Sequence, residues 1–125
     1  MIIGIGTDII EIERVKRAIS NKHFIERVYT IKEQNYCESR GRQAAASYAA
    51  RFAGKEAFFK AIGTGINCSL TDIEIINDNL GCPHVFLKGR AAELFSKINA
   101  NNIHISLSHS KCYATATCII ENNNS

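Results

Sequence analysis

The sequence predicts an α+β domain in which one mainly antiparallel sheet of about five strands packs on one long helix. The alanine-rich segment Gln43 to Ile62 has a helical composition and is followed by Gly63, a residue that commonly ends helices. The second half of the chain contains short apolar runs separated by turn-forming residues, which is typical of hairpins. The 125 residues are 46% hydrophobic and 22% charged, without repeats or linkers, so we expect one domain over residues 1–125.

The first half of the chain is expected to begin with a strand and continue in helices. An apolar run over residues 2–6 predicts the strand, and three apolar residues follow it at helical spacing, Ile12, Val15 and Ile19. Thr30 and Glu33 occupy the two positions of a capping box, and this pair predicts a short helix that ends near Gly41.

The second half is expected to contain two antiparallel pairs with a helix between them. Residues 72–77 and 83–87 are apolar runs separated by polar and glycine residues, so they predict a hairpin with a longer loop. Residues 90–98 place their apolar side chains on one helical face. Residues 103–107 alternate between apolar and polar, and residues 112–120 follow after a tight connection, which predicts the last pair.

Positive charge is concentrated near the N-terminus, although the net charge is only +3. Glu26 is the only acidic residue within the stretch that contains Arg14, Lys16, Arg17, Lys22 and Arg27. Such a stretch can recruit an acidic partner, and it can also be an ordinary solvated helix face.

The cysteines and the hydropathy pattern indicate a soluble cytoplasmic protein. The five cysteines form an odd set without C-x-x-C spacing, which fits reduced thiols. The apolar run at the N-terminus lacks a positively charged leader, and no apolar stretch approaches the length of a membrane span.

Two carboxylates have sequence surroundings that suit a metal ion. Gly4, Gly6 and Asp8 share one face of the expected first strand, and Glu56 lies in an apolar stripe of the long helix, four residues before Lys60. Two carboxylates with space for water and phosphate are what Mg²⁺ prefers. The alternative is structural: the glycines admit a packed helix, Asp8 caps the next helix, and Glu56 pairs with Lys60.

A polar cluster at residues 106–111 suits phosphate binding, because hydroxyls, an imidazole and an ammonium group gather at a strand end. A Ser/His nucleophile pair is disfavoured, since neighbours in a strand point to opposite faces and no G-x-S-x-G motif is present. Gly63, Thr64 and Gly65 could form a phosphate loop, but they follow a helix C-terminus, where the dipole is negative, so a helix cap is the default interpretation.

Three blocks of sequence together resemble the short-type 4′-phosphopantetheinyl transferase family, the holo-acyl-carrier-protein synthases. They are Ile-Gly-Ile-Gly-Thr-Asp-Ile at residues 3–9, Arg-Phe-Ala-Gly-Lys-Glu-Ala-Phe-Phe-Lys-Ala at residues 51–61 running into Gly63, and Ser-Leu-Ser-His-Ser at residues 106–110. The resemblance covers the whole chain in order and length. The one departure we note is Gly54, where alanine is more usual.

The resemblance implies an α+β fold and a reaction in fatty acid biosynthesis. Phosphopantetheine would pass from coenzyme A to a serine of an apo acyl carrier protein, with release of adenosine 3′,5′-bisphosphate. The family is typically homotrimeric, with each coenzyme A site at a subunit boundary. No nucleic acid or membrane takes part.

The resemblance also implies roles for individual residues. Asp8 and Glu56 would bind Mg²⁺, and Lys60 would neutralise phosphate charge beside them, which makes these three the candidate catalytic residues. The candidate coenzyme A contacts are Arg51, Lys55, Lys60, Gly63, Thr64, Gly65, Ser108, His109 and Ser110. Acyl carrier proteins are acidic, so the docking candidates are Arg14 and Arg17 first, with Lys22 and Arg27 next.

Three questions remain open at the level of sequence. The proton of the carrier serine could pass to Glu56 or to a water held by Asp8. The carrier could be a peptidyl or polyketide carrier domain rather than the fatty-acid carrier. A non-catalytic module that binds nucleic acid through the basic stretch is a further alternative, although no nucleic-acid motif is present.

Overall fold

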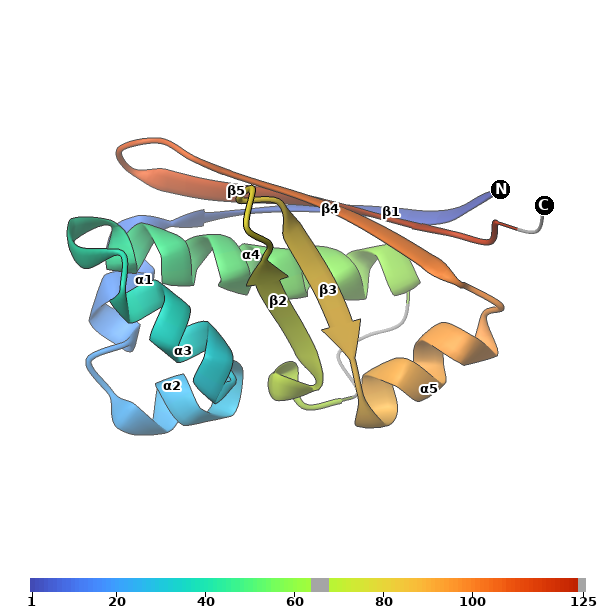
Figure 1. Ribbon diagram of the computed structural model, residues 1–125, viewed down its shortest axis with the longest axis horizontal. Coiled ribbons are helices and arrows are strands. Elements are labelled where there is room, and N and C mark those ends of the chain that lie inside the picture. Colours follow the sequence, from blue (N-terminus) through green and yellow to red (C-terminus); the bar gives the residue numbers. More distant parts are fainter. Residues whose placement is uncertain (64–67, 124–125) are drawn as a thin grey trace.

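The structure is a computed structural model that describes residues 1–63 and 68–123 (Figure 1). Its main elements are β1 (Ile2–Glu11), α1 (Ile12–Ala18), α2 (Lys22–Val28), α3 (Ile31–Glu38), α4 (Ala44–Ile62), β2 (Ile73–Asn77), β3 (Pro83–Leu87), α5 (Gly89–Lys97), β4 (Asn102–His109) and β5 (Tyr113–Glu121). Two short 3₁₀ helices lie at Gly41–Gln43 and Leu70–Asp72. The predicted α+β class is confirmed, with α4 as the long helix.

The strands form two antiparallel sheets rather than the single sheet that we expected. One sheet has the order β1-β5-β4, and β2 and β3 form a separate hairpin. Figure 1 shows the larger sheet running along α4, while the hairpin crosses the helix obliquely. β3 and β4, which α5 separates along the chain, are not hydrogen-bonded neighbours in either sheet of the described residues.

Helix α4 is the centre of the molecule, and residues with little or no side chain let both sheets approach it. A Cβ added at Gly54 would lie 2.6 Å from Ile75 Cδ1, so the glycine leaves room for the hairpin. Alanine at this position would therefore have to displace a flexible methyl group. The departure from the family pattern at Gly54 thus coincides with a close packing contact.

Strand β1 lies so close to α4 that only glycine fits at two positions. A Cβ at Gly4 would lie 1.8 Å from the carbonyl oxygen of Ala61, and one at Gly6 would lie 2.0 Å from that of Ala57. The interpretation that these glycines admit a packed helix is therefore correct. Because side chains two residues apart share a face, Asp8 comes next along the side of β1 that meets α4.

The opposite face of the larger sheet has no element over it in the described structure (Figure 1). Ile5 and Ile9 on β1 are 64% and 63% exposed there, and Tyr113 on β5 is also exposed. The small residues of β5, Ala114, Ala116 and Cys118, face α4 and are buried. These residues belong to the core of the sheet, which leaves the isoleucine face as the uncovered surface.

The N-terminal segment departs from the expected pattern in two ways. Strand β1 runs to Glu11, so Asp8 lies within the strand and does not cap the next helix. The basic stretch is divided between α1 and α2, because the Asn21 side chain accepts hydrogen bonds from His23 N and Phe24 N and starts a new helix. Asparagine is a favoured N-cap, so this break could have been inferred from the sequence.

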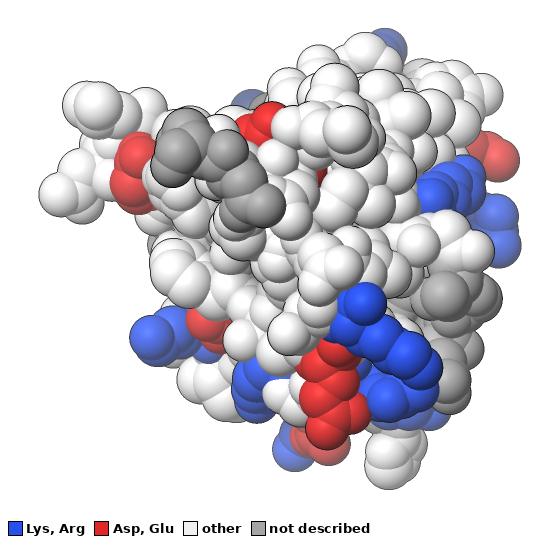
Figure 2. Space-filling view, turned by 90° about the vertical axis from the view of Figure 1, so that its right-hand side faces the viewer, with Lys and Arg blue, Asp and Glu red and all other residues white. Residues whose placement is uncertain are grey.

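The two chain ends meet on one side of the molecule, where Met1 and Asn122 exchange backbone hydrogen bonds. Figure 2 shows that this side is mostly uncharged, with the largest group of basic and acidic side chains in the lower part of the view and smaller charged groups around its rim. None of the described helices is both long and apolar enough to span a membrane.

Candidate active site

Asp8 and Lys60 meet where β1 passes over α4. Lys60 Nζ donates to Asp8 Oδ1 at 3.1 Å and to the carbonyl oxygen of Thr7 at 3.0 Å. The expected alternative, in which Lys60 pairs with Glu56 along the helix, is not what forms. The ammonium group instead joins α4 to β1, and more than half of its side chain stays exposed to solvent.

Glu56 shares this location with Asp8. Desolvation by burial, and then the nearby negative charge of Asp8, raise the pKa of the Glu56 carboxyl, while Lys60 opposes the shift. Within the described structure, no side chain donates a hydrogen bond to Glu56. Two carboxylates therefore lie near one another with a single ammonium group beside them, an arrangement with spare negative charge.

The carboxylate pair suits a hard divalent cation. Mg²⁺ takes oxygen ligands, commonly one or two carboxylates with waters and substrate phosphates completing its shell. Lys60 holds the Asp8 carboxylate in place. The Glu56 oxygens have no side-chain donor in the described structure, so both carboxylates can contribute ligands. Burial and then repulsion from Asp8 raise the pKa of Glu56, and a bound cation would favour the charged form of this carboxyl against both.

Arg51 and His109 lie together in an open groove of about 310 Å³. Arg51 is 2% exposed as a residue, and its guanidinium donates to Asn77 Oδ1 at 2.6 Å and to Ser47 Oγ at 3.1 Å. It stacks on the Tyr36 ring, 4.4 Å from the centroid. Its Nε has no partner. The groove thus has a fixed cation in its wall, which favours an anionic ligand.

A second groove of about 550 Å³ also contacts His109 and continues over Ser110 to the start of α4. Three basic side chains line it, Lys16, Arg42 and Lys111. Ser108 is exposed but lines neither groove. Because alternate residues of β4 face opposite sides, Ser108 lies on the uncovered face of the sheet.

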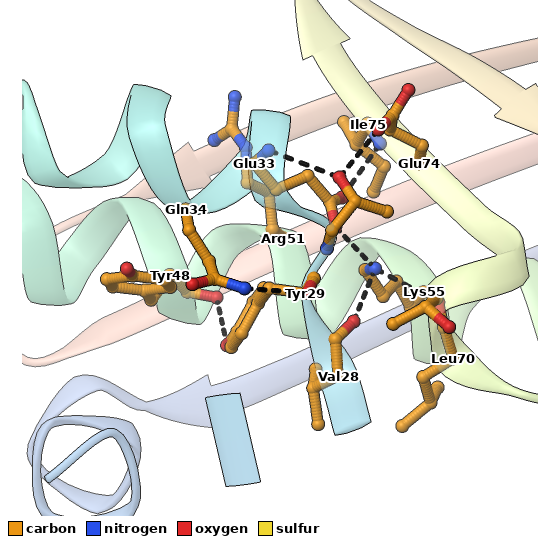
Figure 3. A network of polar contacts seen from close by, with 12 residues as sticks. Val28, Tyr29, Glu33, Gln34, Tyr48, Arg51, Lys55, Leu70, Glu74 and Ile75 are labelled. Carbon is orange, nitrogen blue, oxygen red and sulfur yellow. Dashed lines mark hydrogen bonds and ion pairs between the residues drawn. The ribbon is translucent and has the colours of Figure 1, made fainter. Parts of the chain in front are cut away.

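Lys55 lies in the interior and not on a groove, which corrects our expectation that it contacts coenzyme A. Its side chain is completely buried, and Nζ donates to Glu33 Oε1 at 2.7 Å, to Val28 O at 2.6 Å and to Leu70 O at 3.0 Å. Figure 3 shows these contacts. All three ammonium protons are used, so none is left for a ligand.

Glu33 is the residue whose importance the sequence did not reveal. Its Oε1 accepts from Thr30 N as well as from Lys55, and its Oε2 accepts from Ile75 N at 2.8 Å (Figure 3). Both hydrogen bonds of the predicted capping box are present. The capping pattern predicts the start of a helix, whereas the ion pair of Glu33 with Lys55 on α4 follows only from the fold.

The remaining predicted residues that the structure describes lie on α1, on α2 and at the C-terminal end of α4. Arg14 and Arg17 are exposed on α1, and Lys22 and Arg27 are exposed on α2. Gly63 ends α4 in the left-handed conformation with φ of 82°, as expected for a helix cap. Thr64 and Gly65 lie outside the described residues.

Comparison with known proteins gives one consistent result. Residues 4–118 match the 4′-phosphopantetheinyl transferase superfamily. A holo-[acyl-carrier-protein] synthase of Ruminiclostridium cellulolyticum is 50% identical over 120 residues, which are 93% of this chain and 90% of that protein. One from Fusobacterium nucleatum is 49% identical over 122 residues, covering 96% and 99%.

Solved structures agree with this result. A Bacillus anthracis holo-(acyl-carrier-protein) synthase in complex with CoA (3′,5′-ADP) is 37% identical, with a TM-score of 0.82 and coverage of 98% of this chain and 99% of that one. A Neisseria meningitidis holo-[acyl-carrier-protein] synthase is 34% identical, with a TM-score of 0.87 and coverage of 98% and 100%. The likeness extends over the whole fold.

Proposed function

Because the chain belongs to the 4′-phosphopantetheinyl transferase superfamily, we propose that it transfers 4′-phosphopantetheine from coenzyme A to a serine of an apo acyl carrier protein. The other product is adenosine 3′,5′-bisphosphate, and the reaction supports fatty acid biosynthesis. The observation that carries the proposal is the cluster of Asp8, Glu56 and Lys60, in a chain half identical to holo-[acyl-carrier-protein] synthases. Residues 1–125 act as one transferase domain in this proposal, and the five free cysteines suit the cytoplasm.

Asp8 and Glu56 are the residues that would hold Mg²⁺. When bound, the ion supplies charge neutralisation on the pyrophosphate of coenzyme A and Lewis-acid polarisation of the reacting phosphoryl group. Support comes from the two neighbouring carboxylates, one of which has a raised pKa.

Lys60 and the grooves would position coenzyme A. The Lys60 ammonium group is half exposed beside Asp8, so it can neutralise the non-bridging oxygens as charge develops on them. Arg51 and His109 would bind the nucleotide end, because they place a fixed guanidinium and an imidazole in one groove. Ser110 extends this surface in the adjoining groove.

The serine hydroxyl of the carrier attacks the β-phosphorus of coenzyme A, and the bond from that phosphorus to the nucleotide side of the pyrophosphate breaks. The hydroxyl proton passes to Glu56 or to a water held by Asp8. Positioning and charge neutralisation supply most of the rate in such transfers.

Arg14, Arg17, Lys22 and Arg27 would form the docking face for the acidic carrier, since all four are exposed on α1 and α2. Reversing the charge of Arg14 and Arg17 together is expected to raise the KM for the carrier about tenfold at low salt, with the Kd for coenzyme A unchanged. Equal losses of carrier and coenzyme A binding would contradict a separate docking face.

The uncovered isoleucine face of the larger sheet is where we place the contacts of a homotrimer. Ile5 and Ile9 are exposed there at levels that favour burial against another subunit. Light scattering of the wild type and of Ile5→Asp tests this placement. A trimeric mass in the wild type and a smaller one in the variant are expected, while a monomeric wild type would contradict it.

One assay tests the proposed reaction directly. The protein is incubated with coenzyme A, Mg²⁺ and an apo acyl carrier protein, and the carrier is then weighed by mass spectrometry. A mass gain that corresponds to phosphopantetheine is expected, and its absence would refute the function. The same assay with an apo peptidyl or polyketide carrier domain tests the alternative substrates.

A further inference from the structure

A second group of possible metal ligands lies at the turn of the β2–β3 hairpin, on other elements than those that carry Asp8 and Glu56. Asp78, Cys82 and His84 are all exposed, and one ligand atom from each lies within 4.8 Å of the other two. We call these three residues the hairpin triad. Asp78 follows the end of β2, while Cys82 and His84 flank the first residue of β3.

The turn already holds the aspartate in a fixed orientation. Asp78 Oδ1 accepts hydrogen bonds from Leu80 N at 2.8 Å and from Cys82 N at 3.0 Å, and Gly81 adopts the positive φ of 85° that this turn requires. Oδ2 is left to face the imidazole, with His84 Nε2 at 2.9 Å. One carboxylate oxygen is thus a structural acceptor, and the other faces a second ligand.

Thiolate, imidazole and carboxylate together select a borderline transition metal rather than Mg²⁺. In a tetrahedral zinc site, bond lengths of about 2.0–2.3 Å separate the ligand atoms by about 3.3–3.8 Å. The separations within the hairpin triad need only small side-chain rotations to reach this range. The exposure of all three residues leaves the fourth position open to water.

We propose that the hairpin triad binds one Zn²⁺ ion, or a divalent metal of the same class, through Asp78 Oδ2, Cys82 Sγ and His84 Nε2. On binding, the thiol proton of Cys82 leaves to solvent, and the imidazole carries its proton on Nδ1 so that Nε2 can ligate. The ion joins the end of β2 to the start of β3. This donor set differs in kind from the all-oxygen pair of Asp8 and Glu56.

A metal ion bound to the hairpin triad would lie beside the groove that contains Arg51. The same turn contributes Gly81 and Pro83 to the groove that contains Arg51. Asn77 connects the two, because its side chain donates to Gly81 O at 3.1 Å and accepts from Arg51 at 2.6 Å. A metal at the turn therefore fixes one wall of that groove.

The test is a titration of the metal-free protein with Zn²⁺ and, in parallel, with Co²⁺, in a non-thiol reductant. We expect one equivalent of Zn²⁺ to bind, and the Co²⁺ form to show a thiolate-to-metal charge-transfer band. Cys82→Ser should remove the band, and both Cys82→Ser and His84→Gln should weaken Zn²⁺ binding by more than about tenfold. Circular dichroism checks that each variant is folded.

Matched controls exist on the same chain. Cys112→Ser removes another exposed cysteine, and His104→Gln removes an imidazole that also contacts a carboxylate, that of Glu121 at 2.7 Å. Both controls should bind Zn²⁺ as the wild type does. A charge-transfer band of the Co²⁺ form that survives Cys82→Ser would overturn the proposal. Zn²⁺ uptake by a protein whose Co²⁺ form shows no such band would also overturn it, because the ion would then bind to carboxylates elsewhere.

Discussion

Lys55 and Lys60 lie five residues apart on α4, each beside an acidic residue of another element, and their surroundings differ completely. Lys55 and its partner Glu33 are fully buried, and every proton of the ammonium group has an acceptor. Lys60 is largely exposed, and the carboxylates near it carry more negative charge than it neutralises. The two lysines show that an ion pair with every hydrogen bond satisfied serves the fold, whereas an incomplete one remains available to a ligand.

The largest expected effect is on the buried pair. Lys55→Met should destabilise the protein by about 3–5 kcal/mol, because it leaves the Glu33 carboxylate buried without its counter-ion. Lys60→Met, the same change at the exposed lysine, should cost less than about 1 kcal/mol. Urea unfolding followed by circular dichroism measures both.

A double variant sharpens this result. Adding Glu33→Gln to Lys55→Met removes both charges, while the amide oxygen of glutamine can still accept from Ile75 N. Part of the lost stability should return. Equal destabilisation by the two single lysine variants would show that the comparison is wrong.

The next effect is on catalysis without loss of the fold. Asp8→Ala and Glu56→Ala should each lower kcat of carrier modification by about a hundredfold or more, because the remaining carboxylate cannot hold the cation and balance its charge alone. The melting temperature should stay close to that of the wild type. Glu93→Ala on α5 removes an exposed carboxylate and serves as the control. Near-normal activity of either variant at low Mg²⁺ would disprove the metal site.

The smallest expected effect is on the free energy of unfolding, which the charge of the Glu56 carboxyl lowers. Because folding raises the pKa of Glu56 above its ordinary value of 4.5, the folded protein binds this proton more tightly than the unfolded chain does. The stabilisation from that proton is present at low pH and is lost as the pH rises through the raised pKa.

The stability of the Glu56→Gln variant has no such dependence on pH, because the amide does not titrate. In metal-free buffer near neutral pH the variant should therefore be more stable than the wild type, by less than about 1 kcal/mol because the side chain is only partly buried. The difference should shrink below pH 4.5. Thermal melts over a pH series measure it, and an unchanged difference at all pH values would argue against a raised pKa.

Local signals allowed much of this fold to be predicted. Helix α4 and its cap at Gly63 follow from composition, and the capping box at Thr30 has both of its hydrogen bonds. Asp8 and Glu56 could be singled out as candidates, because a carboxylate in an apolar helix stripe is costly unless it is paired or binds a metal, and because the glycines before Asp8 indicate a close approach.

Long-range packing decided what the sequence could not show. Lys55 stands beside Glu56 in the same motif, and only the fold reveals that it points inward to Glu33, 22 residues away along the chain. The division of the strands into two sheets is likewise a long-range feature, because it depends on which strands pair across the fold. Lys55 and Glu56 are thus neighbours in one motif, but Lys55 is paired in the interior, whereas Glu56 lies near Asp8 in the candidate active site.

The glycines of β1 have a consequence for the engineering of this enzyme. At Gly4 and Gly6 an added methyl group would meet the backbone of α4 rather than a side chain that could move aside. The separation between the strand that carries Asp8 and the helix that carries Glu56 and Lys60 is therefore set by main-chain contact. In a library of all single substitutions, these two positions should tolerate no replacement, and libraries aimed at new substrates should leave them unchanged.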